Sequence, residues 1–204
     1  MIRVIFFDFY SVWTPDTFQE YLNSAQSLGA QEHTALADLV GKYYIGEASL
    51  DDVADVFRYK LGRMEIDKDS LTLHESNISP NVVSLMRSLH GHFLKLGVLA
   101  NLGTMELGLL TGFNASQSLF EAILSPLSLG LKAPLLSQEV FTKALQAVGE
   151  PPASCLVVSG HDDYLAFASS YGMQTIKFVG LGQLMQSLEA LLAKDMPSFV
   201  IPKP

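Results

Sequence analysis

The segment from Val4 to Tyr10 constrains the fold most, because an apolar, aromatic run ends there in a carboxylate. The residues Val4-Ile5-Phe6-Phe7 are too few for a helix and have the continuous apolar character of a buried central strand. Asp8 follows directly, so we expect it at the carboxyl end of that strand. In open parallel α/β sheets, ligands bind at this end. An ordinary loop aspartate that caps the next turn is the alternative.

Length and charge bound the class of protein. A chain of 204 residues can bury a sizeable core. With 13 Lys and Arg against 21 Asp and Glu, the net charge is -8 and no basic stripe is present, so we expect no nucleic-acid partner. No apolar run reaches transmembrane length, and the single Cys155 cannot form an internal disulfide. We therefore expect no membrane partner and a cytoplasmic location. The sequence carries no signal for an oligomeric state.

Strands and helices alternate along most of the chain. The predicted strands are 4–7, 94–100, 120–124, 155–158 and 174–178. The predicted helices between and after them are 79–90, 104–118, 137–148, 162–171 and 184–193. This alternation predicts an α/β fold, a Rossmann-like parallel sheet with right-handed crossovers.

The stretch after the first strand contains no convincing strand of its own. Ser49 as N-cap and Asp52 three residues later form a capping box, followed by apolar residues at helical spacing. The stretch is too long for a simple crossover and predicts an inserted helical lobe. We expect an α/β core formed by residues 1–13 and 79–204, and a helical lobe formed by residues 14–78.

Four loops then come in a fixed order: a strand ending in Asp8, a strand ending in Ala100-Asn101, an isolated Lys132, and a strand ending in Ser159-Gly160. This order resembles the haloacid dehalogenase superfamily, subfamily I, whose Rossmann-like core carries a small helical cap inserted after the first motif. The resemblance implies that residues 14–78 are that cap and that the protein is a hydrolase of a small molecule. It also implies that Asp8 is the nucleophile and that Lys132 holds Asp8 ionised through an ion pair. A surface lysine is the alternative for Lys132.

Several positions depart from the phosphatases of that superfamily and indicate a degenerate active site. Tyr10 stands where they carry a second Asp that acts as general acid and base. Ala100 replaces a Ser or Thr, and Ser159 stands where acidic residues hold Mg²⁺. A hard cation wants several oxygen ligands, and Asp8 alone provides one carboxylate. We expect no cofactor; if Mg²⁺ binds, its ligands are Asp8 and Asp163.

Asp8-Phe9-Tyr10 and Val158-Ser159 resemble the metal-free 2-haloacid dehalogenases, which carry Asp-x-Tyr in the first motif and Ser at the start of the fourth. A carboxylate that displaces halide needs no acid for the leaving group and, with no phosphate dianion to neutralise, no Mg²⁺. Covalent catalysis would run from Asp8 through an ester that water cleaves. Tyr10 would donate a hydrogen bond to the substrate, although an aromatic side chain that simply fills space is the alternative.

Three residues are candidate substrate contacts: Asn101, Ser159 and His161. Asn101 would supply amide donors, although capping the next helix is its alternative role. His161 would act as a general base near neutral pH, although a solvent-exposed loop histidine is the plainer interpretation. Two other functions stay open beside the metal-independent hydrolase. They are a Mg²⁺-dependent phosphatase with a rearranged acidic site, and a catalytically inactive relative that acts as a binding protein.

Overall fold

A five-stranded parallel sheet forms the centre of the computed structural model, which describes residues 1–92 and 94–194. The strands are β1 (Val4–Phe7), β2 (Lys95–Leu99), β3 (Ala122–Leu124), β4 (Cys155–Ser159) and β5 (Gln174–Lys177). They lie in the order β3-β2-β1-β4-β5, and every neighbouring pair is parallel. The predicted α/β, Rossmann-like fold is confirmed, and each predicted strand is present within two residues of its expected bounds.

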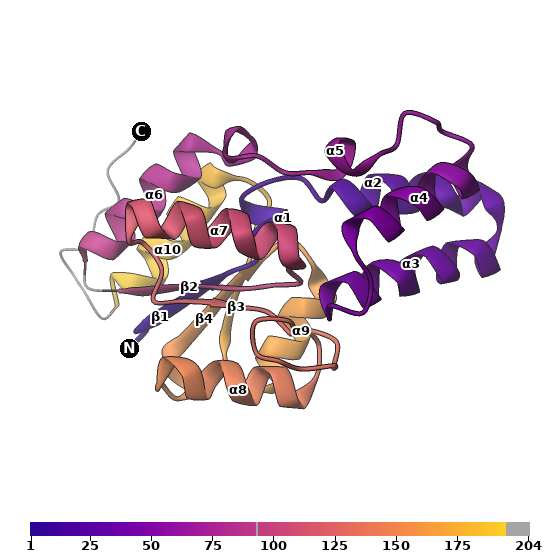
Figure 1. Ribbon diagram of the computed structural model, residues 1–204. Coiled ribbons are helices and arrows are strands. Elements are labelled where there is room, and N and C mark those ends of the chain that lie inside the picture. The colour runs from indigo at the N-terminus through magenta and orange to yellow at the C-terminus, as the bar shows by residue number, and fades with distance from the viewer. Residues whose placement is uncertain (93, 195–204) are drawn as a thin grey trace.

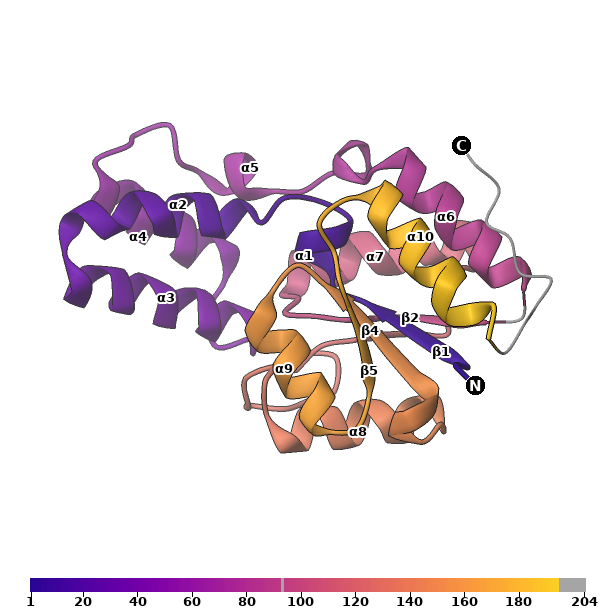
Figure 2. The same ribbon diagram turned by 180° about the vertical axis from the view of Figure 1, so that it is seen from behind.

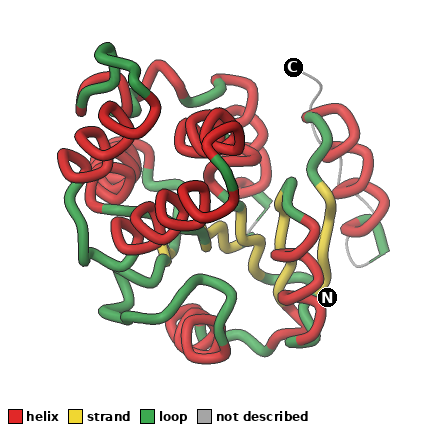
Figure 3. The backbone as a smooth tube through the Cα atoms, turned by 90° about the vertical axis from the view of Figure 1, so that its right-hand side faces the viewer, coloured by secondary structure: helices red, strands yellow, loops and turns green. Residues whose placement is uncertain are grey.

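Helices cover both faces of this sheet (Figures 1 and 3). One face carries α6 (Pro80–Gly91), α7 (Thr104–Gln117) and α10 (Leu181–Leu192), and the other carries α8 (Gln138–Val148) and α9 (Asp162–Ser170). The short η3 (Pro152–Ser154) leads directly into β4. Side chains of a strand alternate between the faces, so Ile5 and Phe7 of β1 join one buried cluster while Val4 and Phe6 join the other. Burial on both faces explains why the strand is apolar throughout.

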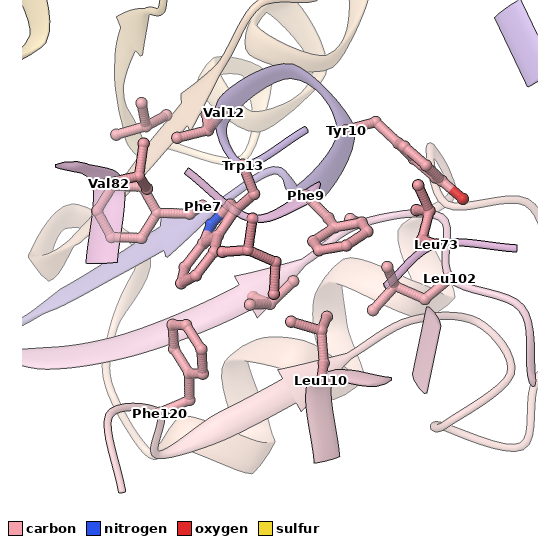
Figure 4. Packing of buried hydrophobic residues seen from close by; sticks show 14 of the residues in the cluster. Phe7, Phe9, Tyr10, Val12, Trp13, Leu73, Val82, Leu102, Leu110 and Phe120 are labelled. Atoms are coloured by element: carbon pink, nitrogen blue, oxygen red, sulfur yellow. The ribbon is translucent and has the colours of Figure 1, made fainter. Parts of the chain in front are cut away.

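The exit of β1 is fixed by aromatic packing. The short helix α1 (Phe9–Val12) follows Asp8 at once, and Trp13 ends it. The Trp13 ring lies 5.2 Å from the Phe120 ring and 6.0 Å from the Phe113 ring, centroid to centroid. Figure 4 shows Trp13 near Phe120 among other buried apolar side chains, with the Tyr10 hydroxyl directed away from the Trp13 ring. This packing gives the backbone around Asp8 a rigid support.

Between α1 and α6 the chain forms a helical lobe beside the sheet (Figures 1 and 2). Its elements are α2 (Thr17–Ala25), η1 (Gln26–Leu28), α3 (Ala30–Tyr44), α4 (Leu50–Leu61), α5 (Lys68–Leu71) and η2 (Glu75–Asn77). The described residues of the lobe contain no strand, and the capping box of Ser49 and Asp52 is confirmed at the start of α4. The exact domain borders after residues 13 and 78 stay predictions. The last ten residues of the predicted core, 195–204, lie outside the described residues.

The order of the strands places the site. From β1 the chain adds β2 and then β3 on one side, and it later returns to add β4 and β5 on the other. The direction of winding therefore reverses between β1 and β4, which is where open α/β sheets form their ligand crevice. Asp8 follows β1 and Ser159 ends β4, so both lie at this reversal. No helix in the described part of the chain is long and apolar enough to cross a membrane.

Candidate active site

Asp8 is a nearly buried carboxylate at the end of the central strand, with 5% of its surface exposed. Its backbone N–H donates to the carbonyl oxygen of Val158, at 2.9 Å, which ties β1 to β4 at this level. Two hydroxyls donate to one carboxylate oxygen: Ser11 Oγ lies 2.7 Å and Ser159 Oγ 2.8 Å from Asp8 Oδ2. Both of these hydrogen bonds end on Oδ2, so Oδ1 is the candidate attacking atom.

Backbone N–H groups orient both serine hydroxyls toward Asp8. The N–H of Gly160 donates to Ser11 Oγ at 2.8 Å, and the N–H of His161 donates to Ser159 Oγ at 3.1 Å. Each hydroxyl oxygen therefore accepts from the backbone and directs its proton to the carboxylate. A Cβ atom at position 160 would lie 2.9 Å from the Ser11 Cβ, so this contact requires glycine.

The pKa of Asp8 is raised above its ordinary value, and burial is the main cause. The hydrogen bonds from Ser11 and Ser159, the nearby imidazole of His161 and the backbone N–H of Tyr10 act in the opposite direction. The Nε2 atom of His161 lies 3.8 Å from Asp8 Oδ2, and about half of the His161 side chain is exposed. His161 therefore lies within reach of both Asp8 and solvent.

Asp8 opens into a cavity of about 310 Å³ between the sheet and the helical lobe. Of the predicted site residues, Tyr10, Asn101, His161 and Asp163 also line this cavity. Sequence reasoning missed Ser11 and Asp16. Ser11 lies one helical turn after Asp8, the spacing at which two side chains share a face. Asp16, another lining residue, caps α2 by accepting from the N–H of Gln19, and burial raises the pKa of its carboxyl.

Lys132 does not form the predicted ion pair with Asp8. Its ammonium lies 3.5 Å from Glu47 Oε1 and 3.4 Å from the carbonyl oxygen of Ile45, both on the helical lobe. It lines a second cavity of about 440 Å³, which adjoins the first and shares with it the lining residues Ala37, Gly41, Tyr44, Asn101, Leu135 and Leu136. The loop from β3 to α8 carries Lys132 toward the lobe rather than toward the strand ends, so no lysine offsets the burial of Asp8 among the described residues.

The Tyr10 hydroxyl is engaged by a carboxylate that the sequence did not single out. It donates to Glu106 Oε1, while Tyr43 donates to Glu106 Oε2 at 2.7 Å and the N–H of Gly103 donates to the same oxygen at 3.0 Å. A Cβ atom at position 103 would lie 2.2 Å from the Tyr43 ring, which explains the glycine. Since Glu106 belongs to α7 and Tyr43 to α3, this network ties the sheet layer to the lobe.

Burial dominates the electrostatics of this network too. Glu106 is fully buried, and desolvation raises the pKa of its carboxyl although Tyr10 and Tyr43 donate to it. The pKa values of the Tyr10 and Tyr43 hydroxyls are also raised, mainly by burial. Tyr10 therefore stays a neutral phenol whose proton is directed at Glu106. As it lies, its hydroxyl does not donate to a substrate beside Asp8.

The donor set does not fit an octahedral Mg²⁺ site as these side chains lie. Two hydroxyl protons face Asp8 Oδ2, and the side chain that ends β4 beside it, Ser159, offers a hydroxyl rather than a carboxylate. Among the described residues, no group of three or more Asp, Glu, His or Cys side chains could hold a metal ion. Mg²⁺ prefers several oxygen ligands at near-ideal geometry. Binding through Asp8 and Asp163 would require these side chains to rearrange.

Comparisons with known proteins agree with this geometry at the level of the fold. No family model and no curated protein matches the sequence. A predicted HAD-like family hydrolase from Porphyromonas gingivalis superimposes with a TM-score of 0.66 over 94% of this chain and 98% of its own, at 20% identity. The L-2-haloacid dehalogenase from Xanthobacter autotrophicus gives 0.57 over 99% of this chain and 85% of its own, at 16% identity. A HAD family enzyme from Bacteroides thetaiotaomicron, in complex with magnesium and inorganic phosphate, gives 0.60 over 87% and 94%, at 13% identity. The chain has the haloacid dehalogenase-like fold, as its motifs predicted.

Proposed function

We propose that this protein is a hydrolase that uses Asp8 as a covalent nucleophile on a small molecule, without a metal ion. One observation supports this most directly: the buried Asp8 carboxylate opens into a cavity, and both serine hydroxyls donate to the same one of its oxygens. A carboxylate held in this way is oriented, and its other oxygen is left for attack. The helical lobe would act as the cap that closes the cavity.

The reaction that suits these residues is displacement at carbon followed by ester hydrolysis. Asp8 Oδ1 forms a C–O bond with the substrate carbon, and the leaving group departs with the bonding electron pair. Water then adds to the carboxyl carbon of the ester, and His161 Nε2, near Asp8 Oδ2, accepts the proton of this water. Collapse releases an alcohol, regenerates Asp8, and frees a proton to solvent. Asn101, which also lines the cavity, would contact the substrate.

Isotope labelling tests the nucleophile directly. In ¹⁸O-water with enzyme in excess over an alkyl halide, the first product should contain unlabelled oxygen from Asp8, and the peptide that contains Asp8 should gain the label. Asp8→Asn should abolish both the product and the label. Label in the first product with none in the peptide would mean that water attacks the substrate directly, and the proposal would fail.

A Mg²⁺-dependent phosphatase is a second candidate, favoured by Asp163 and Asp16, which line the cavity together with Asp8. On that proposal Mg²⁺ would neutralise the phosphate when bound, and Asp8 would attack phosphorus. Turnover of an aryl phosphate that appears only with Mg²⁺, and disappears in both Asp8→Asn and Asp163→Asn, would favour it over the metal-independent reaction. An inactive protein would give neither product nor label with any substrate.

A further inference from the structure

The charge of the cavity beside Asp8 does not suit an anionic ligand. Three carboxylates line it, those of Asp8, Asp16 and Asp163, against the single imidazole of His161. None of the described residues that line it is a lysine or an arginine. A carboxylate or phosphate that entered would meet like charges with no fixed cation to pair with, which costs free energy in a partly buried site.

The adjoining cavity does not correct this balance. Lys42 and Lys132 line it, but so do Asp38 and Glu47, and Lys132 is already paired with Glu47 at 3.5 Å. Its cations and anions are therefore equal in number, whereas the cavity beside Asp8 has an excess of carboxylates. An ammonium group would restore the balance there.

The rest of the lining suits the body of such a cation. Two aromatic rings, of Phe18 and Tyr44, line the cavity from the helical lobe together with the aliphatic side chains of Leu22 and Val40. Aromatic faces attract a cation and also pack against apolar groups. The volume of about 310 Å³ is at the lower end of the range for small-molecule sites, so the ligand has to be small.

Two of the carboxylates are held in place by the backbone. Asp16 Oδ1 accepts from the N–H of Gln19 at 3.1 Å, and Asp163 Oδ1 accepts from the N–H of Tyr164 at 2.9 Å. Burial raises the pKa of the Asp16 carboxyl, and the neighbouring Asp8 acts in the same direction. A bound cation would relieve both effects, because it favours the ionised carboxylates.

We propose that the cavity selects a small molecule with an ammonium group on an apolar body, with Asp16 and Asp163 as the residues that determine the specificity for the cation. The reaction of this ligand rests on the proposed function, although its binding does not. As a substrate it would be an amine with a leaving group on carbon. Displacement by Asp8 and hydrolysis of the ester would turn it into an amino alcohol.

Three probes with the same aryl-ethyl body test the charge preference: phenethylamine, phenethyl alcohol and hydrocinnamate. Calorimetric titration of the full chain at neutral pH and low salt should show the amine binding at least tenfold more tightly than the alcohol, with the carboxylate weakest. Asp16→Asn and Asp163→Asn should each weaken the amine about fivefold and leave the alcohol unchanged. Asn also serves as an N-cap, so the Asp16 variant keeps the start of α2.

Asp162→Asn is the matched control. Asp162 precedes Asp163, but it does not line the cavity and is paired with Lys177 at the surface. This variant should bind the amine as the wild type does. Equal weakening in Asp162→Asn, or hydrocinnamate binding as tightly as the amine, would overturn the proposal. Tight binding of Mg²⁺ alone that depends on the same two aspartates would also overturn it, in favour of a metal site.

The outcomes separate this inference from the proposed function. Binding of the amine without any labelled Asp8 peptide from halogenated amines would leave the inference standing and remove the nucleophile. Labelling of the Asp8 peptide by chloropropionate, but not by a chloroalkylamine of similar size, would support the nucleophile and refute the preference for a cation.

Discussion

Asp8, at the end of β1, and Glu106, in the first turn of α7, are both buried carboxylates with raised pKa values, and each accepts two side-chain hydroxyl hydrogen bonds. At Asp8 both hydroxyls donate to the same oxygen, and the carboxylate lines a cavity. At Glu106 both oxygens accept, and the residue lines neither cavity described above. A raised pKa marks burial in both places, but an oxygen open to a ligand distinguishes a candidate reactive group from a structural one.

The largest expected effect is a difference in the free energy of unfolding between variants of the two carboxylates. A glutamine at 106 has one carbonyl oxygen and one NH₂ group, yet donors face both positions, so a buried donor loses its acceptor. We expect Glu106→Gln to lower the free energy of unfolding by about 1–3 kcal/mol. Asp8→Asn should not lower it at pH 7, because the carbonyl oxygen of Asn can take the Oδ2 position and the NH₂ group can face the cavity. Urea unfolding measures both.

Glu121→Gln is the control for the loss of one negative charge, since Glu121 is exposed. It should change the free energy of unfolding by less than about 0.5 kcal/mol. If Asp8→Asn were as destabilising as Glu106→Gln, the contrast between an open and a closed carboxylate would be wrong.

A smaller effect is expected from Tyr10→Phe, which links the two regions. Its hydroxyl donates to Glu106 while its ring lines the cavity. The variant removes one neutral-to-carboxylate hydrogen bond and keeps the ring, so it should cost about 1–2 kcal/mol of stability. Tyr10→Phe should change kcat by less than about threefold, because the hydroxyl proton of Tyr10 is directed at Glu106. Loss of a general acid would typically cost about a hundredfold or more. A hundredfold loss of kcat without loss of stability would restore the hydrogen bond to the substrate that the sequence suggested for Tyr10.

The sequence predicted what depends on strand ends and missed what depends on loops and on contacts between the sheet and the lobe. Asp8 comes directly after β1, and Ser159 ends the adjacent parallel strand β4. Their contact therefore follows from the alternation of strands and helices. Lys132 lies in the irregular loop from β3 to α8, where no periodicity fixes the path, and the predicted ion pair with Asp8 is not formed.

Glu106 was missed for a different reason. An acid in the first turn of a helix is favoured by the helix dipole whatever else it contacts, so its sequence position carries no sign of burial. Its role as a buried acceptor depends on Tyr10 from α1 and Tyr43 from the helical lobe, and these contacts join residues 96 and 63 positions apart. Ser11 was within reach of sequence reasoning, since the interval from Asp8 is one helical turn.

A still smaller effect concerns the pH dependence of stability at Asp8. Its folded pKa is raised above the unfolded value, so its contribution to stability is fully present below about pH 4 and is lost as pH rises through the folded pKa. Asn has no proton to lose. Asp8→Asn should therefore match the wild type near pH 3.5 and become the more stable protein as pH approaches 7. Thermal unfolding across this range measures the difference; a gain that shrinks toward pH 7 would mean that ionised Asp8 stabilises the fold.

The smallest expected effect is a shift in the pH profile of turnover. Asp8 has to be ionised to attack, so kcat should fall as pH drops through its raised pKa, and the acid limb should lie above the value of about 4 for an ordinary aspartate.

The protonated His161 imidazole lowers the pKa of Asp8 through its charge, with Nε2 at 3.8 Å from Oδ2. His161→Gln removes that charge, and the acid limb should move to higher pH. His33→Gln, at a half-exposed position on α3 that does not line the cavity, is the matched control and should leave the limb in place. If His161 also accepts the proton of the hydrolytic water, kcat on the plateau falls as well, and labelled ester should accumulate on Asp8. A shift of the limb without accumulated ester would assign His161 to the charge of Asp8 alone and leave the water to another base.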